Sequence, residues 1–240
     1  MEKLKSGAAG LGIHLTEQQL EKFETYYREL AAWNEIINLT SITGYEEVQV
    51  KHFLDSLTVT AALPPDAPGK NLSVIDIGTG AGLPGIPLKI VLPGVRLVLL
   101  EATAKKTRFL QHLLAQLDLA DVEVVTGRAE EVARDNRYRE RFDLALSRAV
   151  AALPALSELA LPFCAIGGAF VAQKKGDISL ELARARKAIE LLGGRLREIM
   201  PVSLEGLGDE RRLVVIEKIK PTPPEYPRRP GMPEKRPIGP

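Results

Sequence analysis

The sequence predicts an α/β protein of Rossmann-like class, with a seven-stranded, mostly parallel sheet, a final antiparallel hairpin and extra helices at the N-terminus. Short apolar runs alternate with amphipathic stretches from residue 73 onward, which is typical of parallel strands joined by crossover helices. A dense glycine cluster directly follows the first run. The last two runs, 195–204 and 211–219, are joined by a loop too short for a helix, 205–209, so we expect them to pair antiparallel.

Residues 1–68 are expected to form a helical extension packed on the core. The first 14 residues are small and glycine-rich, and we expect them to be poorly ordered. Thr16-Glu-Gln-Gln19 has the pattern of a capping box, in which two side chains bond reciprocally to backbone N–H groups. Apolar residues then recur every three or four positions, which predicts a one-faced helix to about Asn34.

A second helical stretch is predicted over 45–63, closed by Pro64-Pro65. Its middle reads His52-Phe-Leu-Asp-Ser56, which is polar enough to interrupt the apolar face. This segment either turns toward a ligand or is a solvated surface, and its pattern does not decide between the two.

The core, residues 69–219, is organised around the stretch from Asn71 to Glu101. A buried strand at 73–77 is followed by four glycines, which let the backbone turn with positive φ and approach a ligand closely: Gly78, Gly80, Gly82 and Gly85. Pro87 lies just inside the next helix, and a second strand ends in Glu101. This βαβ unit places its glycine loop and its acid on the ligand-binding edge of the sheet.

The alternation continues beyond this unit. A helix over 103–119 leads to a strand at 122–126, a strand at 142–146 ends in Ser147-Arg-Ala-Val150, and a strand at 169–173 leads into Lys174-Lys175. Two further helices, about 153–163 and 178–192, complete the crossovers. Residues 220–240 contain 8 of the 17 prolines, and we expect this tail to stay outside the core.

Composition limits the class of protein. A formal net charge of +1 indicates that any nucleic-acid surface must be a local patch. Cys164 is the only cysteine, so no internal disulfide can form, and a reducing compartment is expected. There is no apolar run long enough to cross a membrane and no metal-binding pattern. We expect a soluble, cytoplasmic protein that binds no membrane or metal and is monomeric.

Two cofactors fit the glycine loop. The string Gly80-Ala-Gly-Leu-Pro-Gly85 together with Glu101 permits a dinucleotide. Asp76 argues against it, because its carboxylate would face the pyrophosphate at close range. S-adenosylmethionine has no phosphate, carries a sulfonium and an ammonium, and offers a ribose diol to Glu101. The residues therefore favour S-adenosylmethionine, while a nicotinamide or an α/β domain that binds neither cofactor remains open.

The absence of certain motifs from the sequence limits the kinds of methylation that the chain could catalyse. The fourth strand lacks the polar-Pro-Pro-aromatic motif common in enzymes that methylate exocyclic base nitrogens. Methylation at a pyrimidine carbon needs an activated thiolate, and Cys164 is better interpreted as a packed core thiol. His14 and His112 are interpreted as structural or surface residues. The remaining possibility is methyl transfer to an atom that needs no covalent activation by the enzyme, such as an endocyclic nitrogen with a free lone pair.

Five segments of the chain form a recognisable set: Asp76-Ile-Gly-Thr-Gly-Ala-Gly-Leu-Pro-Gly-Ile-Pro87, Ser147-Arg-Ala-Val150, Trp33-Asn34 with Asn38-Leu-Thr40, His52-Phe-Leu-Asp-Ser56 and Tyr226-Pro-Arg-Arg-Pro230. Together they resemble the ribosomal RNA small subunit methyltransferase G family. The resemblance covers nearly the whole chain. It implies a class I S-adenosylmethionine methyltransferase fold, N7 methylation of one guanine in 16S rRNA, and 16S rRNA or the small ribosomal subunit as partner.

The resemblance also implies a set of cofactor residues, which join Asp76, Gly80 and Gly82 from the loop pattern. They are Gly78, Leu83, Glu101, Ala102, Thr103, Ala129, Glu130 and Arg148. Glu101 would accept from the ribose, Ala129 and Glu130 would lie against the adenine edge, and Arg148 would neutralise the methionine carboxylate or hold RNA. The segment Glu101-Ala-Thr103 departs from the more usual Asp-Ser pair, which leaves the role of Thr103 open.

No side chain is assigned a catalytic role. Arg148, Lys174 and His52 are candidates for positioning the substrate, and a basic rim is expected from Arg148, Lys174, Lys175, Arg228 and Arg229. The alternatives are an NAD(P)-dependent oxidoreductase, a non-catalytic ribosome-binding factor, and a small-molecule methyltransferase, which would have no use for a basic tail.

Overall fold

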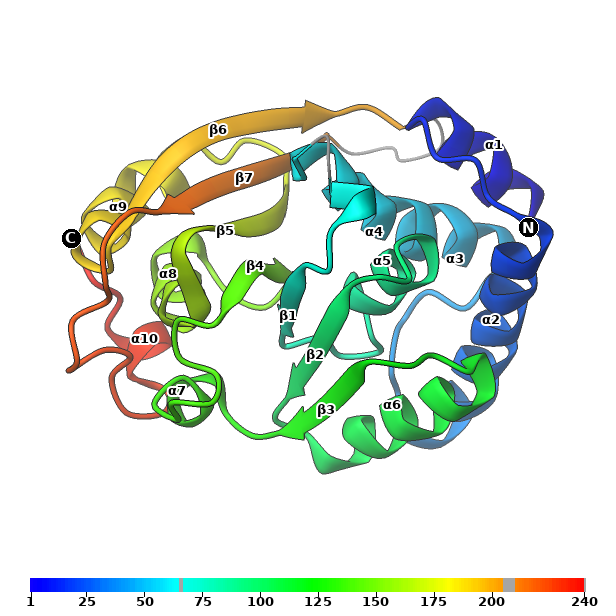
Figure 1. The fold of residues 1–240 in the computed structure, drawn as a ribbon, viewed down its shortest axis with the longest axis horizontal. Helices are drawn as coiled ribbons and strands as arrows, with labels where there is room; N and C mark the ends of the chain where they lie inside the picture. Colours follow the sequence, from blue (N-terminus) through cyan, green and yellow to red (C-terminus); the bar gives the residue numbers. More distant parts are fainter. Residues whose placement is uncertain (65–66, 205–209, 240) are drawn as a thin grey trace.

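The sheet is the centre of the fold. A computed structural model describes residues 1–64, 67–204 and 210–239, and contains seven strands in the order β3-β2-β1-β4-β5-β7-β6 (Figure 1). The strands are β1 Ser73–Ile77, β2 Arg96–Glu101, β3 Val122–Thr126, β4 Phe142–Arg148, β5 Cys164–Lys175, β6 Gly194–Val202 and β7 Arg211–Lys218. Strands β1 to β5 run parallel, whereas β7 is antiparallel to both β5 and β6.

The predicted fold class is confirmed, including the antiparallel hairpin. The hairpin enters the sheet with β7 between β5 and β6, so that β6 is the edge strand. The predicted connecting loop, 205–209, lies outside the described residues, as does Pro65 of the predicted Pro64-Pro65 stop.

Successive side chains along each strand point to opposite faces of the sheet, so the sheet contributes to two apolar cores, one on each face. Val74, Leu99 and Leu146 face one core, which the N-terminal helices share, and Ile75, Leu100 and Ala145 face the other. Helices α5 Gly85–Val91 and α6 Ala104–Leu117 cover the first face. Helices α7 Ala129–Val132, α8 Leu153–Ala160 and α9 Ser179–Leu191 lie toward the second (Figure 1).

Helix α2, Glu17–Ile37, begins with the predicted capping box. The Thr16 hydroxyl accepts a hydrogen bond from the Gln19 backbone N–H at 3.2 Å, and the Gln19 side chain accepts one from the Thr16 backbone N–H at 3.0 Å. The helix runs three residues past Asn34 and ends at Asn38, which adopts a left-handed conformation. It packs on α6, where Trp33 lies against Phe109.

The first 14 residues are not poorly ordered, so that expectation is wrong. Residues Glu2–Gly10 form helix α1, and Leu4 and Ala8, one turn apart, are buried in the first core. A Cβ at Gly7 would lie 2.2 Å from Leu54, which shows how closely α1 approaches the stretch beneath it. The small residues that suggested disorder are those that permit this contact.

The stretch after Gly44 is one continuous helical run of changing pitch. It comprises α3 Tyr45–Val48, the π-helix η1 Gln49–Leu54, α4 Asp55–Leu57 and the 3₁₀ helix η2 Thr58–Ala62. The predicted polar segment coincides with the π-helix and the residues after it. Short 3₁₀ turns also occur at η3 Ala67–Gly69 and η4 Leu161–Phe163. None of the helices in the described part of the chain is both long and apolar enough to span a membrane.

The proline-rich tail packs against the protein, which corrects the expectation that it stays outside the core. Pro227, Pro233 and Ile238 are buried, and a short helix, α10 Met232–Lys235, contacts α8. The Arg139 guanidinium donates to the tail carbonyls of Thr222, Pro223 and Tyr226 at 2.9–3.2 Å. Prolines prevent regular elements, but they leave carbonyl oxygens that arginine side chains can satisfy.

Candidate active site

The predicted site residues gather at the carboxyl ends of the parallel strands. Glu101 ends β2, Arg148 ends β4 and Lys174 lies at the end of β5, while the glycine loop follows β1. Arg148 pairs in register with Gln173 on β5, so the ends of these two strands are neighbours. In an open α/β sheet this edge is where ligands bind.

The glycine loop needs glycine for two physical reasons. Gly78, Gly80 and Gly82 have φ values of 66°, 60° and 93°, which residues with a Cβ rarely adopt. A Cβ on Gly78 would also lie 2.7 Å from the Val150 side chain, which comes from the loop after β4. The Tyr26 hydroxyl on α2 donates to the Ala81 carbonyl at 2.5 Å, so the N-terminal extension helps to hold the loop.

Asp76 is fully buried beneath this loop. One carboxylate oxygen accepts from the Thr79 hydroxyl at 2.6 Å and from the Gly85 N–H at 2.8 Å. The other oxygen, Oδ1, is buried and has no hydrogen-bond partner among the described residues. Burial raises the pKa of Asp76 to about 6, against the opposing effect of the two hydrogen bonds. Such an acceptor would gain a partner from an ammonium group and would repel a pyrophosphate.

Glu101 also bonds to backbone groups. Its carboxylate accepts from the Gly80 N–H at 3.1 Å and from the Thr103 N–H at 2.8 Å, and the residue is only 7% exposed. A carboxylate offers about four lone-pair positions, so acceptor capacity for a diol remains. Together with the partnerless oxygen of Asp76, these features fit S-adenosylmethionine better than a dinucleotide.

The predicted adenine-edge residues lie at the start of α7. Glu130 is buried, and its carboxylate accepts from the Gly231 N–H of the tail at 2.8 Å and lies 3.3 Å from the Arg128 guanidinium. This bond to the tail was not predicted. Among the other proposed cofactor residues, Leu83 is buried in the loop, whereas Ala102 and Thr103 are exposed beside Glu101.

A cavity of about 490 Å³ opens beside this site, at the ends of β4 and β5. Its lining contains all three predicted positioning residues, His52, Arg148 and Lys174. The other lining residues are Ile42, Lys51, Asp55, Ala149, Gln173, Lys175 and Arg211. We call it the acceptor pocket. The Lys174 ammonium donates to the Ala151 carbonyl at 2.8 Å and pairs with Glu181 at 2.6 Å.

His52 lies in the wall of the acceptor pocket in its neutral form. Its Nε2 is 2.8 Å from the Thr40 hydroxyl, and its Nδ1 is 3.4 Å from the Arg148 guanidinium. Burial, with a further contribution from the positive charge of Arg148, lowers the pKa of His52 to about 4. The ring therefore carries no charge near neutral pH and acts through hydrogen bonds.

Asp55, Gln173 and Arg211 are among the residues of the acceptor pocket that were not predicted as site residues. The Asp55 carboxylate binds the Arg148 guanidinium at 3.0 Å and the Arg211 guanidinium at 2.9 Å, and the Gln173 side chain donates to the Asp55 carbonyl at 2.7 Å. The polar interruption at 52–56 contained the signal for Asp55. Arg211 and Gln173 occur in apolar strands without any motif, so only the sheet pairing brings them to the site.

The cysteine and the two histidines that we interpreted as structural or surface residues lie away from the site. Cys164 begins β5 opposite Phe142, so it lies at the other edge of the sheet, and burial raises the pKa of its thiol to about 12. His112 bonds Glu29 at 2.7 Å between α6 and α2, and His14 is exposed. No group of three or more His, Cys, Asp or Glu side chains within the described residues is arranged to hold a metal.

Arg228, predicted for the basic rim, pairs with an acid of α8. Its guanidinium makes a bidentate pair with the buried Glu158 carboxylate, with N–O distances of 2.9 Å and 2.6 Å. This side chain therefore anchors the tail to α8, while the expectation that Arg228 contacts RNA stays a prediction. Its neighbour Arg229 is exposed.

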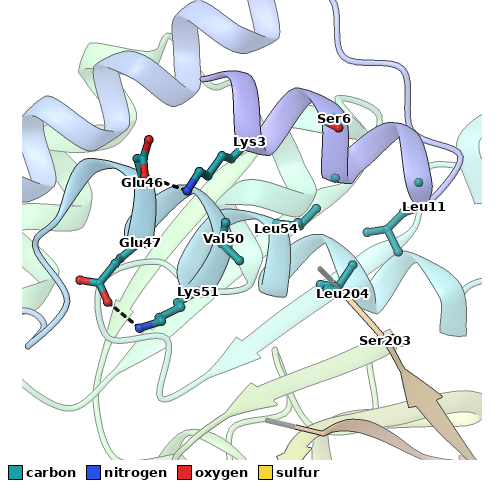
Figure 2. Close-up of a pocket in the computed structure, with 12 residues that line it drawn as sticks. Lys3, Ser6, Leu11, Glu46, Glu47, Val50, Lys51, Leu54, Ser203 and Leu204 are labelled. Carbon is teal, nitrogen blue, oxygen red and sulfur yellow. Dashed lines mark hydrogen bonds and ion pairs between the residues drawn. The ribbon is translucent and has the colours of Figure 1, made fainter. Parts of the chain in front are cut away.

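A second cavity, of about 580 Å³, lies between α1, the 45–54 stretch and the end of β6 (Figure 2). Val50 and Leu54 form part of its wall, and the Lys3–Glu46 and Lys51–Glu47 pairs lie at 2.7 Å and 2.5 Å (Figure 2). Lys51 lines both cavities, but the lining of this one includes no residue from the ends of β4 or β5. Although it is larger, it lies away from the strand ends that carry the site.

The family model and the relatives that this chain matches carry the same description. The family model described as rRNA small subunit methyltransferase G matches residues 19–214. A Dehalococcoides mccartyi (strain BAV1) protein named ribosomal RNA small subunit methyltransferase G is 50% identical over 239 residues, 99% of this chain and 100% of that protein. One of the same name from Pelotomaculum thermopropionicum is 48% identical over 237 residues, 99% of this chain and 98% of that one.

Solved structures share the fold at low sequence identity. MtNAS, solved in complex with MTA and tNA, has a TM-score of 0.56 at 16% identity, covering 90% of this chain and 75% of its own. TrmN from Thermus thermophilus has a TM-score of 0.51 at 19% identity, covering 71% of this chain and 53% of its own. At this level of identity the similarity supports the α/β architecture alone.

Proposed function

Because this chain belongs to the rRNA small subunit methyltransferase G family, we propose that it methylates N7 of one guanine in 16S rRNA, with S-adenosylmethionine as methyl donor. The observation that supports this most directly is the position of the acceptor pocket. It opens at the ends of β4 and β5, and β4 pairs with β1, the strand that the glycine loop follows.

The residues around the loop would hold the cofactor, which supplies an electrophilic methyl group. Glu101 would bind the ribose hydroxyls, and the unused Asp76 oxygen would face positive charge. Ala129 and Glu130 would lie against the adenine edge, where Glu130 already binds the tail. The glycines would bring the backbone close to the cofactor without Cβ interference.

Guanine N7 carries a lone pair and no proton, so the chain does not need a general base. The neutral His52 and the buried Cys164 thiol, whose pKa is raised to about 12, agree with this chemistry. The acceptor pocket would hold the base so that N7 faces the methyl group, and this positioning would supply much of the rate enhancement. In an A-form helix N7 is hidden in the deep groove, so the target base should be in a loop or flipped out.

We also propose that the chain acts as a monomer in the cytoplasm, on 16S rRNA or the assembled small subunit. Light scattering during gel filtration would test the monomer. A dimer mass would contradict it.

Mapping 7-methylguanosine in 16S rRNA tests the function. Incubation of an unmodified 16S transcript, or of small subunits lacking the modification, with the chain and S-adenosylmethionine should yield one modified guanine. A modification at another atom, or none with either substrate, would contradict the proposal. Tight NADH binding without S-adenosylmethionine binding would instead support the oxidoreductase alternative.

A further inference from the structure

One carboxylate in the acceptor pocket holds two arginines from distant parts of the chain. Asp55 Oδ2 lies 3.0 Å from Arg148 Nη1, and Asp55 Oδ1 lies 2.9 Å from Arg211 Nε. The side chains of Asp55, Arg148 and Arg211 are 6%, 14% and 8% exposed. Two guanidinium groups and one carboxylate give this cluster a net charge of +1 at the wall of a cavity.

The position of Asp55 is itself fixed by the sheet. The Gln173 amide on β5 donates to the Asp55 carbonyl at 2.7 Å and to the Thr58 hydroxyl at 3.0 Å. The Thr58 hydroxyl donates to the same Asp55 carbonyl at 2.6 Å. Arg148 is also held by the Lys51 carbonyl at 3.2 Å. The cluster is therefore ordered before any substrate arrives, as a precise binding site requires.

Two unusual backbone features meet at this cluster. Asp55 directly follows the π-helix η1, a form that is rare and frequent at functional sites. Ala149, next to Arg148, has φ of 56°, a left-handed conformation that costs free energy for a residue with a Cβ. Buried ion pairs are also poor stabilisers compared with apolar side chains of similar size. These features point to a binding role.

The ligand class follows from the chemistry of the lining. The lining of the acceptor pocket includes a single carboxylate, that of Asp55. It also includes five cationic side chains, those of Lys51, Arg148, Lys174, Lys175 and Arg211. Arginine is suited to phosphate because its planar fork of N–H donors matches two oxygens at once. The methionine carboxylate of the cofactor has similar chemistry, so the two sources must be separated by experiment.

We propose that Asp55 is a positioning residue for the RNA substrate, which holds Arg148 and Arg211 as a guanidinium pair that binds a phosphate beside the target nucleotide. This inference rests on the proposed function, since it assumes that RNA enters the acceptor pocket. It adds Asp55 and Arg211 to the substrate site and gives the π-helix a function.

Asp55→Asn tests the proposal, because it removes the charge with little change in volume. Affinity for an unmodified 16S transcript should fall at least tenfold, and the slope of log affinity against log salt should fall by about 0.7 for one lost phosphate contact. The KM for RNA should rise with little change in kcat, and Asp55→Glu should restore part of the loss. Affinity for S-adenosylmethionine should not change.

Arg212→Gln is the matched control. Arg212 is the neighbour of Arg211 in β7 but pairs with Glu210 at 2.7 Å, and it does not line the acceptor pocket. It should bind RNA with the slope of the parent. If Asp55→Asn does not fold, Arg211→Lys provides the same test, because it keeps the charge and loses the fork.

Two results would overturn the proposal. One is unchanged RNA affinity and salt slope in a folded variant. The other is loss of S-adenosylmethionine affinity with RNA binding intact, which would assign the pair to the methionine carboxylate. Failure of the proposed function would look different from failure of this inference, because the parent chain itself would then leave 16S rRNA unmodified.

Discussion

Asp76 and Glu101 hold the glycine loop, and we propose that they also bind the cofactor. Each carboxylate accepts two hydrogen bonds from the glycine loop or the residues beside it, and each retains acceptor capacity. The sequence predicted both acids from their positions at strand ends. It did not predict that they also hold the loop, because those bonds depend on the path of the loop in three dimensions.

Because we propose that Asp76 binds the cofactor, its raised pKa leads to a prediction about the pH dependence of cofactor binding. Burial and the charge of Glu101 raise the pKa to about 6, whereas Thr79, Gly85 and Arg148 oppose the rise. The folded chain thus favours the protonated form, so Asp76 contributes stability below its ordinary pKa, and that contribution is lost as the pH rises through about 6. The ionised form is the one that attracts a cationic ligand.

We therefore expect S-adenosylmethionine affinity to fall as the pH is lowered from about 7 to about 5, across the folded pKa of Asp76. Asp76→Asn should bind at least tenfold more weakly at neutral pH, since a charge-assisted hydrogen bond contributes about 1.5–3 kcal/mol. Its affinity should also vary less with pH. Titration calorimetry of both proteins over this range is the measurement. A variant with the affinity and pH dependence of the parent would contradict the assignment.

Methylation should not require the thiol of Cys164. Burial raises its pKa to about 12, and it lies at the opposite edge of the sheet from the site. Cys164→Ser should lose stability, because a hydroxyl in an apolar site costs about 1–3 kcal/mol, but should still methylate rRNA. Single-turnover methylation below the melting temperature checks this. Complete loss of turnover in a folded variant that binds cofactor would revive a mechanism with a covalent thiol adduct.

At the scale of elements, regular patterns were predictable and exceptions were not. The capping box, the glycine loop and the final hairpin depend on local residues, and the structure has all three. Helix α1 was missed because two buried side chains among glycines and alanines give a weak periodic signal. The π-helix and the packed tail depend on partners far away in sequence, such as Arg148 for η1 and Arg139 for the tail.

The tail anchor leads to a prediction about stability. Arg228→Ala would leave the fully buried Glu158 carboxylate without its bidentate partner. Breaking a buried pair in this way costs about 3–5 kcal/mol, which a urea titration would detect. Arg229→Ala, at the next and exposed position, should be close to neutral for stability.

Equal stability of the Arg228 and Arg229 variants would contradict this account of the tail. If instead Arg228→Ala folds normally and loses only RNA affinity, the earlier interpretation of Arg228 as an RNA contact would be right.

At the scale of the whole molecule, positive side chains are concentrated in one pocket although the net charge is nearly zero. The formal net charge is +1, yet five cationic side chains line the acceptor pocket. The sequence predicted three of them, Arg148, Lys174 and Lys175, from their positions after strands four and five. Lys51 and Arg211 join them only because the N-terminal extension and the antiparallel strand β7 pack at the same edge.

This arrangement predicts that RNA affinity depends on where a charge lies and little on the total. Lys174→Gln with Lys175→Gln removes two charges from the acceptor pocket, and the slope of log affinity against log salt should fall by about 1.4 if both contact single-stranded RNA. Lys3→Gln with Lys5→Gln removes the same charge from α1, where the side chains pair with Glu46 and Glu17 at 2.7 Å and 3.3 Å. That control should keep the slope of the parent. Equal losses in both double variants would show that overall charge governs binding, because a field set by the whole molecule responds alike to either pair, and the acceptor pocket would then have no special role in holding RNA.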